Sequence, residues 1–185
     1  MKKVAMFGSA RTKSITRLYK DTTDAAKLLV KNGWTVATGG GPGLMEAANK
    51  GAKSVCEEGV CSLGYSIYLP FEAETNAHVQ EDHHHKNFFT RLEEFATCDA
   101  FIALPGGWGT LLEILTVVQL LQVQHIDPRP LILVGAENVL TMERAEITLK
   151  KSGYVGIDEG PFWDIAKNPM EAARLLLKKT SETDD

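Results

Sequence analysis

Short apolar runs alternate with segments of helical periodicity along most of the chain. Residues 3–9, 34–38, 60–69, 99–105 and 130–135 are rich in apolar side chains, and each run ends at or beside a glycine or a proline. The intervening segments, such as 14–32, repeat apolar residues every three or four positions, as helices do. Strands that alternate with helices predict an α/β fold in which a parallel sheet carries helices on both faces.

The size and charge of the chain narrow the classes of protein to consider. Its 185 residues fit one domain, 1–185, without an internal repeat or a linker. The formal net charge of -4 gives no general attraction to nucleic acid or to an anionic membrane, so an anion must be held by a local site. The apolar runs are too short to span a bilayer, and the apolar run that follows the basic first residues is too short for a signal peptide. We therefore expect a cytoplasmic protein.

Cysteines and histidines give no sign of a cross-linked or metal-bound fold. Cys56, Cys61 and Cys98 are odd in number and lack CxxC spacing, which argues against a disulfide framework and a structural zinc site. Cys98 is expected in the core. Residues 70–83 are expected to form a loop and 84–97 a helix, so the run His83-His84-His85 is interpreted as solvated rather than metal-binding.

Three strands are followed by glycine- or serine-containing turns. These turns are GSAR at 8–11, GGGPG at 39–43 and PGGWGT at 105–110. Since they follow parallel strands, they should meet at one edge of the sheet, where ligands bind. Backbone N–H groups at the start of a helix suit a phosphate, although any one glycine turn can serve packing alone. The absence of GxxxxGK[ST] and GxGxxG disfavours a nucleoside triphosphatase and a nicotinamide oxidoreductase.

Two of these turns together carry a more specific signal. The stretch TGGGPGLMEAANKGA at 38–52, followed by LPGGWGTLLE at 104–113, resembles the family of LONELY GUY cytokinin-activating phosphoribohydrolases, whose bacterial relatives are labelled possible lysine decarboxylases. The resemblance implies a Rossmann-like single domain, a dimer or larger homo-oligomer, and no cofactor or metal. It also implies hydrolysis of the N-glycosidic bond of a nucleoside 5′-monophosphate. Decarboxylation would normally need a pyridoxal-bound lysine, and neither glycine turn contains a lysine.

The resemblance also assigns roles to residues. Arg91 and Glu113 would be catalytic, with Glu113 stabilising the positive charge that develops on the sugar. The residues expected to bind substrate and phosphate are Ser9, Gly40, Gly41, Gly43, Met45, Glu46, Gly106, Gly107, Trp108, Gly109 and Thr110.

Several alternatives stay open at this stage. Thr110 and Glu113 have the spacing of a helix capping box, with Thr110 as N-cap. Trp108 could cover the ligand or pack. The whole chain could instead be a carrier that binds a nucleotide-like ligand or the molybdenum cofactor without hydrolysis. The segment 110–124 is apolar around most of its circumference, with Glu113 in a narrow polar line, which predicts contact with a second copy of the chain.

Overall fold

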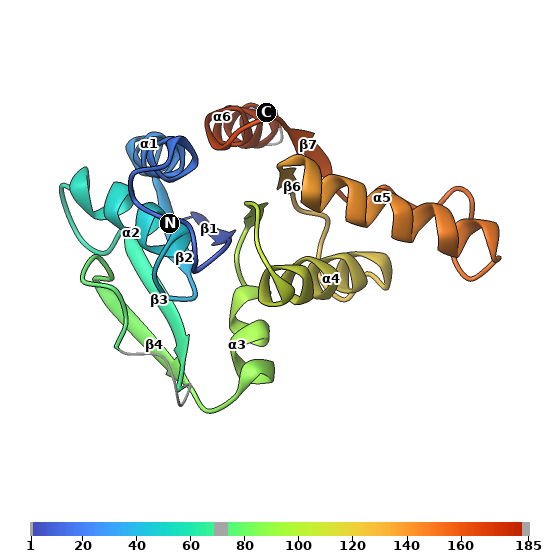
Figure 1. Cartoon of the computed structure of the whole chain (residues 1–185), viewed down its shortest axis with the longest axis horizontal. Helices are drawn as coiled ribbons and strands as arrows, with labels where there is room; N and C mark the ends of the chain where they lie inside the picture. The colour runs from blue at the N-terminus through green and yellow to red at the C-terminus, as the bar shows by residue number, and fades with distance from the viewer. Residues whose placement is uncertain (1, 69–73, 183–185) are drawn as a thin grey trace.

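The chain forms seven strands and six helices in the computed structural model, which describes residues 2–68 and 74–182. Figure 1 shows their arrangement. The strands are β1 (Lys2–Phe7), β2 (Trp34–Thr38), β3 (Ser62–Ile67), β4 (Glu81–His85), β5 (Ala100–Ala103), β6 (Leu131–Val134) and β7 (Asp164–Ala166). The helices are α1 (Arg17–Lys31), α2 (Leu44–Ser54), α3 (Phe88–Phe95), α4 (Trp108–Gln122), α5 (Ala136–Lys151) and α6 (Pro169–Ser181).

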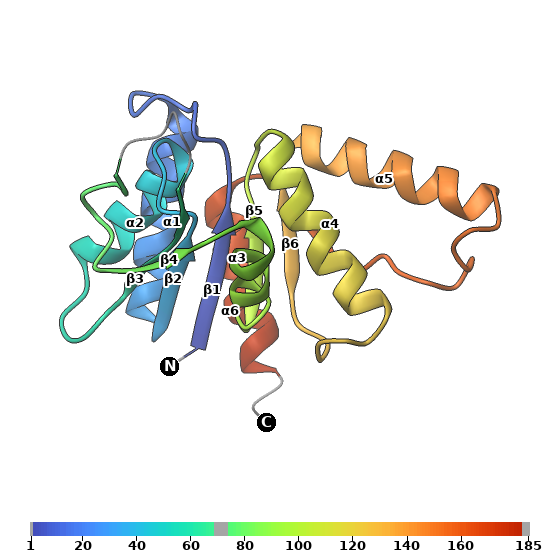
Figure 2. The same ribbon diagram turned by 90° about the horizontal axis from the view of Figure 1, so that it is seen from below.

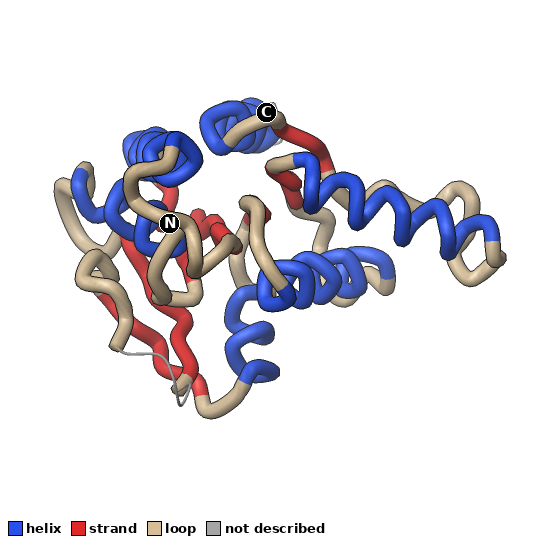
Figure 3. The backbone as a smooth tube through the Cα atoms, in the orientation of Figure 1, coloured by secondary structure: helices blue, strands red, loops and turns tan. Residues whose placement is uncertain are grey.

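All strands belong to one parallel sheet in the order β4-β3-β2-β1-β5-β6-β7. The order reverses beside β1, which makes the β1–β5 boundary the topological switch point. Helices α1, α2 and α6 cover one face, and α3, α4 and α5 lie on the other, nearer the viewer in Figure 2. The tube in Figure 3 shows the same layers by secondary structure. The predicted α/β, Rossmann-like fold with a parallel sheet and helices on both faces is thus confirmed.

A separate apolar core fills each face of the sheet. Alternate residues of β1 point to opposite faces, so Val4 and Met6 pack with α1, α2 and α6, whereas Ala5 and Phe7 pack with α3, α4 and α5. Cys98 is fully buried in the second core, as expected. Within the described residues, no helix combines the length and apolar character needed to cross a membrane.

Helix starts follow their local signals in two places and depart from them in a third. Thr16 caps α1 by accepting from the Tyr19 N–H, and Asn168 caps α6 just before Pro169. Proline favours the first turn of a helix, which would place Pro42 inside α2. That helix instead begins after Gly43, whose positive φ of 71° turns the chain, and Pro42 precedes it.

The polar segment before α3 is a strand, which corrects the prediction of a solvated loop over 70–83 with a helix from 84. Strand β4 pairs with β3 from Glu81 to His85. Helix α3 begins only after Asn87, whose side chain accepts from the N–H groups of Phe89 and Thr90. The sequence hid this strand because β4 lies at the edge of the sheet. Its side chains are held by polar contacts rather than by burial, so they show no apolar alternation. Residues 70–73 of the expected loop, and residue 69 before it, lie outside the described residues.

The expectation that the chain lacks a disulfide is wrong. Cys56 and Cys61 are bonded across the connection between α2 and β3, with a Cα–Cα distance of 5.8 Å, and Cys98 remains a thiol. CxxC spacing was the wrong criterion, because a turn brings two cysteines five residues apart within bonding distance.

This bond should stabilise the fold modestly, because it closes a short loop. We predict that Cys56→Ser lowers the free energy of unfolding by about 2 kcal/mol or less, as the loop-entropy relation gives for so short a closure. Urea unfolding with and without a reductant checks this. The reductant should destabilise the wild-type chain and leave Cys56→Ser unchanged, and equal effects on both proteins would contradict the prediction.

Candidate active site

The three predicted turns meet at one edge of the sheet and are joined through Ser9. The Ser9 N–H donates to the Pro105 carbonyl at 3.0 Å, and the Ser9 carbonyl accepts from the Leu44 N–H at 2.9 Å. The Ser9 hydroxyl accepts from the Arg11 N–H in its own turn. The turn after the central strand β1 therefore fixes the turns after β2 and β5 relative to each other.

The glycines of the second turn allow close packing that a side chain would block. A Cβ on Gly43 would lie 2.4 Å from the Ser9 carbonyl oxygen, and one on Gly41 would lie 2.7 Å from Met45 Cε. Gly40 has a φ of 75°. Met45 therefore packs under the turn. Glu46 instead interacts with Tyr19 of α1. Burial, followed by the charge and the hydrogen bond of Glu46, raises the pKa of Tyr19.

Two asparagines that the sequence reasoning missed hold this turn in place. Asn76 Nδ2 donates to the carbonyls of Gly40 and Gly41 and to Asn49 Oδ1, each at 3.0 Å. Asn49 is fully buried in α2, and its Oδ1 also accepts from Thr38. A buried asparagine in an amphipathic helix is a recognisable signal, because its amide must find partners. Asn76 lies in an irregular connection and gave no such signal.

The PGG turn begins helix α4 earlier than expected. The helix starts at Trp108 with Gly107 as N-cap and has no side-chain cap, so Thr110 is its third residue. The capping-box interpretation of Thr110 and Glu113 is therefore wrong. Gly106 gives Thr110 space, since a Cβ on Gly106 would lie 2.0 Å from Thr110 Oγ1.

The first turn of α4 is open on its outer side. Gly106, Gly107 and Gly109 are exposed, and Trp108 is 87% exposed, which favours a place at the rim over a packing role for Trp108. The first N–H groups of a helix have no partner within it. The start of α4 can therefore donate to an anion.

A buried ion pair connects helices α3 and α4 at this edge. Arg91 Nη2 donates to Glu113 Oε1 at 3.3 Å, and the two side chains are only 11% and 10% exposed. The guanidinium also lies 5.0 Å from the centre of the Phe88 ring. Glu113 belongs to the buried face of α4, not to the polar line predicted for it.

A cavity of about 290 Å³ lies beside this ion pair. Its wall includes Arg91, Ser66 of β3, Asn76 and the glycine turn from 39 to 42. The Ser66 hydroxyl is fixed by β4, since it donates to Asp82 Oδ2 at 2.8 Å and lies 3.0 Å from His84 Nδ1. Gly40 and Gly41 thus line the cavity, whereas the PGG turn does not; Arg91, the ion-pair partner of Glu113, connects the cavity to α4.

Burial controls the protonation of Glu113. Loss of solvent raises the pKa of this carboxyl to about 7, and the positive charge of Arg91 opposes the rise. A carboxyl with a pKa near neutrality can both accept and donate a proton under ordinary conditions, as acid–base catalysis requires.

Comparison with protein families places the chain. Residues 45–176 match the model of a family described as "possible lysine decarboxylase". The chain belongs to the possible lysine decarboxylase family. This result confirms the resemblance seen in the two glycine motifs. A comparison with curated protein sequences finds no match.

Solved structures share the fold of this family member over nearly the whole chain. The structural-genomics target TM1055 is 22% identical, with 96% of this chain and 99% of that chain covered and a TM-score of 0.69. The molybdenum cofactor binding protein from the phototrophic bacterium Rippkaea orientalis is 22% identical, with 97% of each chain covered and a TM-score of 0.63. The molybdenum cofactor carrier protein from Chlamydomonas reinhardtii is 17% identical, with 97% and 98% covered and a TM-score of 0.62.

The raised pKa of Glu113 predicts a pH dependence of stability. Because its folded pKa lies above its ordinary value of 4.5, this group stabilises the fold at acidic pH, and the contribution is lost as the pH rises through about 7. Relative to Glu113→Gln, the wild-type chain should lose up to roughly 3 kcal/mol of unfolding free energy between about pH 5 and about pH 8. Urea unfolding of both proteins measures this difference. A pH-independent difference would contradict the burial argument, and Glu93→Gln on the exposed side of α3 is the control.

Proposed function

We propose that this protein is a nucleoside 5′-monophosphate phosphoribohydrolase, which hydrolyses the N-glycosidic bond to release a base and ribose 5-phosphate. The observation that carries the proposal is the buried ion pair in which Arg91, which lines the cavity, meets Glu113 of α4. A carboxyl with a pKa near neutrality and an arginine that fixes it are suited to a reaction in which the sugar becomes positively charged.

The start of α4 would hold the phosphate. Exposed Gly106, Gly107 and Gly109 let an anion approach the free N–H groups, and Thr110 lies in the same turn. The partial positive charge of the helix N-terminus favours this arrangement. A phosphate fixed there would orient the ribose toward Glu113. Glu113 lies five residues after Trp108, the first residue of α4.

Arg91 would contact both the ligand and the catalytic carboxylate. Its Nη2 meets Glu113, and the residue lines the cavity. Its Nε is buried without a hydrogen-bond partner among the described residues. A buried N–H group without an acceptor is costly, which supports a ligand oxygen as the missing partner.

The proposed chemistry breaks the bond between the anomeric carbon and the base nitrogen and forms a bond from water to the same carbon. Ionised Glu113 would stabilise the sugar cation and take a proton from the attacking water. Passing that proton on to the nitrogen of the departing base would complete the neutral base and regenerate the carboxylate. The reaction needs no cofactor or metal. Within the described residues, no group of three or more His, Cys, Asp or Glu side chains is arranged to hold a metal ion.

A non-catalytic carrier of a nucleotide-like ligand or the molybdenum cofactor is the second candidate. It is favoured by the shared fold with two proteins named for molybdenum-cofactor binding and carriage. Glu113 favours the hydrolase, because a carrier does not need a carboxyl with a pKa near 7 beside its ligand.

Turnover of a panel of nucleoside 5′-monophosphates, with ribose 5-phosphate as the measured product, tests the proposal. We expect Glu113→Gln to lower turnover roughly a hundredfold or more, because a neutral amide cannot take a proton from water. Arg91→Ala should also impair turnover, and Glu93→Gln should not. The matching free nucleosides should be very poor substrates, since they lack the group that the α4 turn would hold.

The outcomes separate the two candidate functions. Tight binding of a nucleotide or the molybdenum cofactor without product would favour the carrier. Wild-type turnover by Glu113→Gln would contradict the role assigned to that carboxyl, and equal turnover of nucleoside and nucleotide would contradict the phosphate site.

We also propose that the chain forms a homodimer or a larger homo-oligomer through α4 and α5. Leu112 and Leu115 of α4 and Val123 just after it are exposed, as are Leu140, Ile147 and Leu149 of α5. An exposed apolar surface of this kind is typical of protein interfaces. In Figures 1 and 2, α5 extends away from the sheet, which leaves both helices accessible to another copy.

Light scattering at micromolar concentration tests the assembly. The wild-type chain should have a mass of at least twice 20.3 kDa. A Leu112→Glu, Leu115→Glu double variant should dissociate, because two charges cannot be buried unpaired at low cost. Ile165→Glu, which changes an exposed residue of β7, is the control. A wild-type mass of one chain would refute the proposal.

A further inference from the structure

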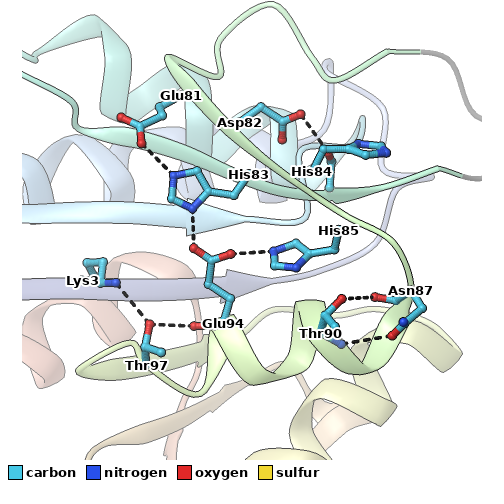
Figure 4. A network of polar contacts seen from close by, with 11 residues as sticks. Lys3, Glu81, Asp82, His83, His84, His85, Asn87, Thr90, Glu94 and Thr97 are labelled. Carbon is cyan, nitrogen blue, oxygen red and sulfur yellow. Dashed lines mark hydrogen bonds and ion pairs between the residues drawn. The ribbon is translucent and has the colours of Figure 1, made fainter.

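Neither the packing of the core nor the proposed reaction explains the three histidines of β4. Alternation along the strand sends His84 toward Ser66, and it sends His83 and His85 to the face that α3 covers. Figure 4 shows His83 and His85 converging on one carboxylate of that helix, Glu94.

Glu94 uses both of its oxygens in this contact. Its Oε1 meets His83 Nδ1 in a hydrogen bond. Its Oε2 lies 2.6 Å from His85 Nε2, a close approach without hydrogen-bond geometry, since that nitrogen has no hydrogen-bond partner among the described residues. The second ring nitrogen of His83, Nε2, lies 2.7 Å from Glu81 Oε1. His83 thus has a carboxylate at each nitrogen, and it can donate to both only when the ring is doubly protonated and positively charged.

Helix α3 has only eight residues, so its position depends on its contacts. On one side Leu92 and Phe95 pack into the core. On the side toward β4, Glu94 is the charged anchor. One turn before Glu94, on the same helix, is Arg91, which meets Glu113.

We propose that His83 and His85 are positioning residues, which clamp Glu94 and thereby hold α3 so that Arg91 reaches Glu113 and the cavity. The proposal rests on the proposed function and deepens it, because it assigns control of Arg91 to the edge strand β4. It concerns the geometry of the pair and can be tested without substrate.

The clamp has a definite dependence on pH. Hydrogen bonds to Glu81 and Glu94 raise the pKa of His83 above its ordinary value of 6.5. Other titratable or charged groups near this cluster include Tyr65, whose ring stacks on His83 at 5.5 Å, and the Cys98 thiol, which interacts with both Tyr65 and Glu94. The Nζ of Lys3 donates to Thr97 just after the helix. Because His83 is charged below its raised pKa, the clamp is closed below that pKa, and it weakens as the pH rises through it.

The matched experiment changes one carboxyl of α3 at a time. Glu94→Gln removes the anchor, and Glu93→Gln removes its exposed neighbour as the control. Amide hydrogen exchange of residues 88–95 should become roughly fivefold to tenfold faster in Glu94→Gln, since local opening follows the lost interaction. Carboxyl NMR should also show a higher pKa for Glu113 in that variant, because Arg91, which lowers this pKa, is no longer held beside it. A helix that was merely less stable but still kept Arg91 in place would leave Glu113 unchanged.

A second arm protects the test if Glu94→Gln fails to fold. In the wild-type chain, α3 exchange corrected for its intrinsic rate should rise as the pH is raised above the ordinary histidine pKa of 6.5, and His83→Gln should abolish that rise. Unchanged exchange in Glu94→Gln, an unchanged Glu113 pKa, or a rise that persists in His83→Gln would each overturn the proposal. Failure of nucleotide turnover with these NMR results intact would instead count against the proposed function alone.

Discussion

The ion pair between Arg91 and Glu113 is the interaction on which the candidate site depends. Its two residues come from helices that follow different strands, and 22 positions separate them in the sequence. Removing two charges from water is costly, and their attraction offsets that cost only when the geometry is held. The surrounding features supply that geometry. Ser9 ties the glycine turns, Asn76 fixes the turn after β2, and Glu94 anchors the helix that carries Arg91.

Local patterns sufficed to predict the fold and the meeting of the turns. Alternating apolar runs and glycines report on backbone geometry, which is why five strands and the common edge followed from the sequence. The two strands that were missed, β4 and β7, lie at the edges of the sheet, where polar side chains carry little signal. Contacts between residues far apart in the sequence could not be predicted from local patterns either. Neither the burial of Glu113 nor the support from Asn76 can be read from spacing, and the capping box suggested by Thr110 gave way to a helix that starts two residues earlier.

Family membership and shared fold constrain the function unequally. The possible lysine decarboxylase family includes this chain, yet neither glycine turn contains the lysine that such chemistry would need. The structural neighbours named for the molybdenum cofactor are too dissimilar in sequence to transfer a ligand. The choice between hydrolysis and carriage therefore rests on Glu113, since a buried carboxyl near neutral pKa is an unfavourable feature to keep in a fold without a use for it.

Strand β4 also has a consequence for solubility. An outermost strand offers unpaired backbone groups to any other strand, and this is a common route to aggregation. The composition of β4, with Glu81 and Asp82 followed by three histidines, makes it a poor partner for such pairing, because a second strand laid against it would take these charged and polar side chains out of water. The contacts of His83 and His85 with Glu94 also favour the observed register of β4 on β3. The residues that hold the helix in place therefore also keep the open edge of the sheet from extending into a neighbouring molecule.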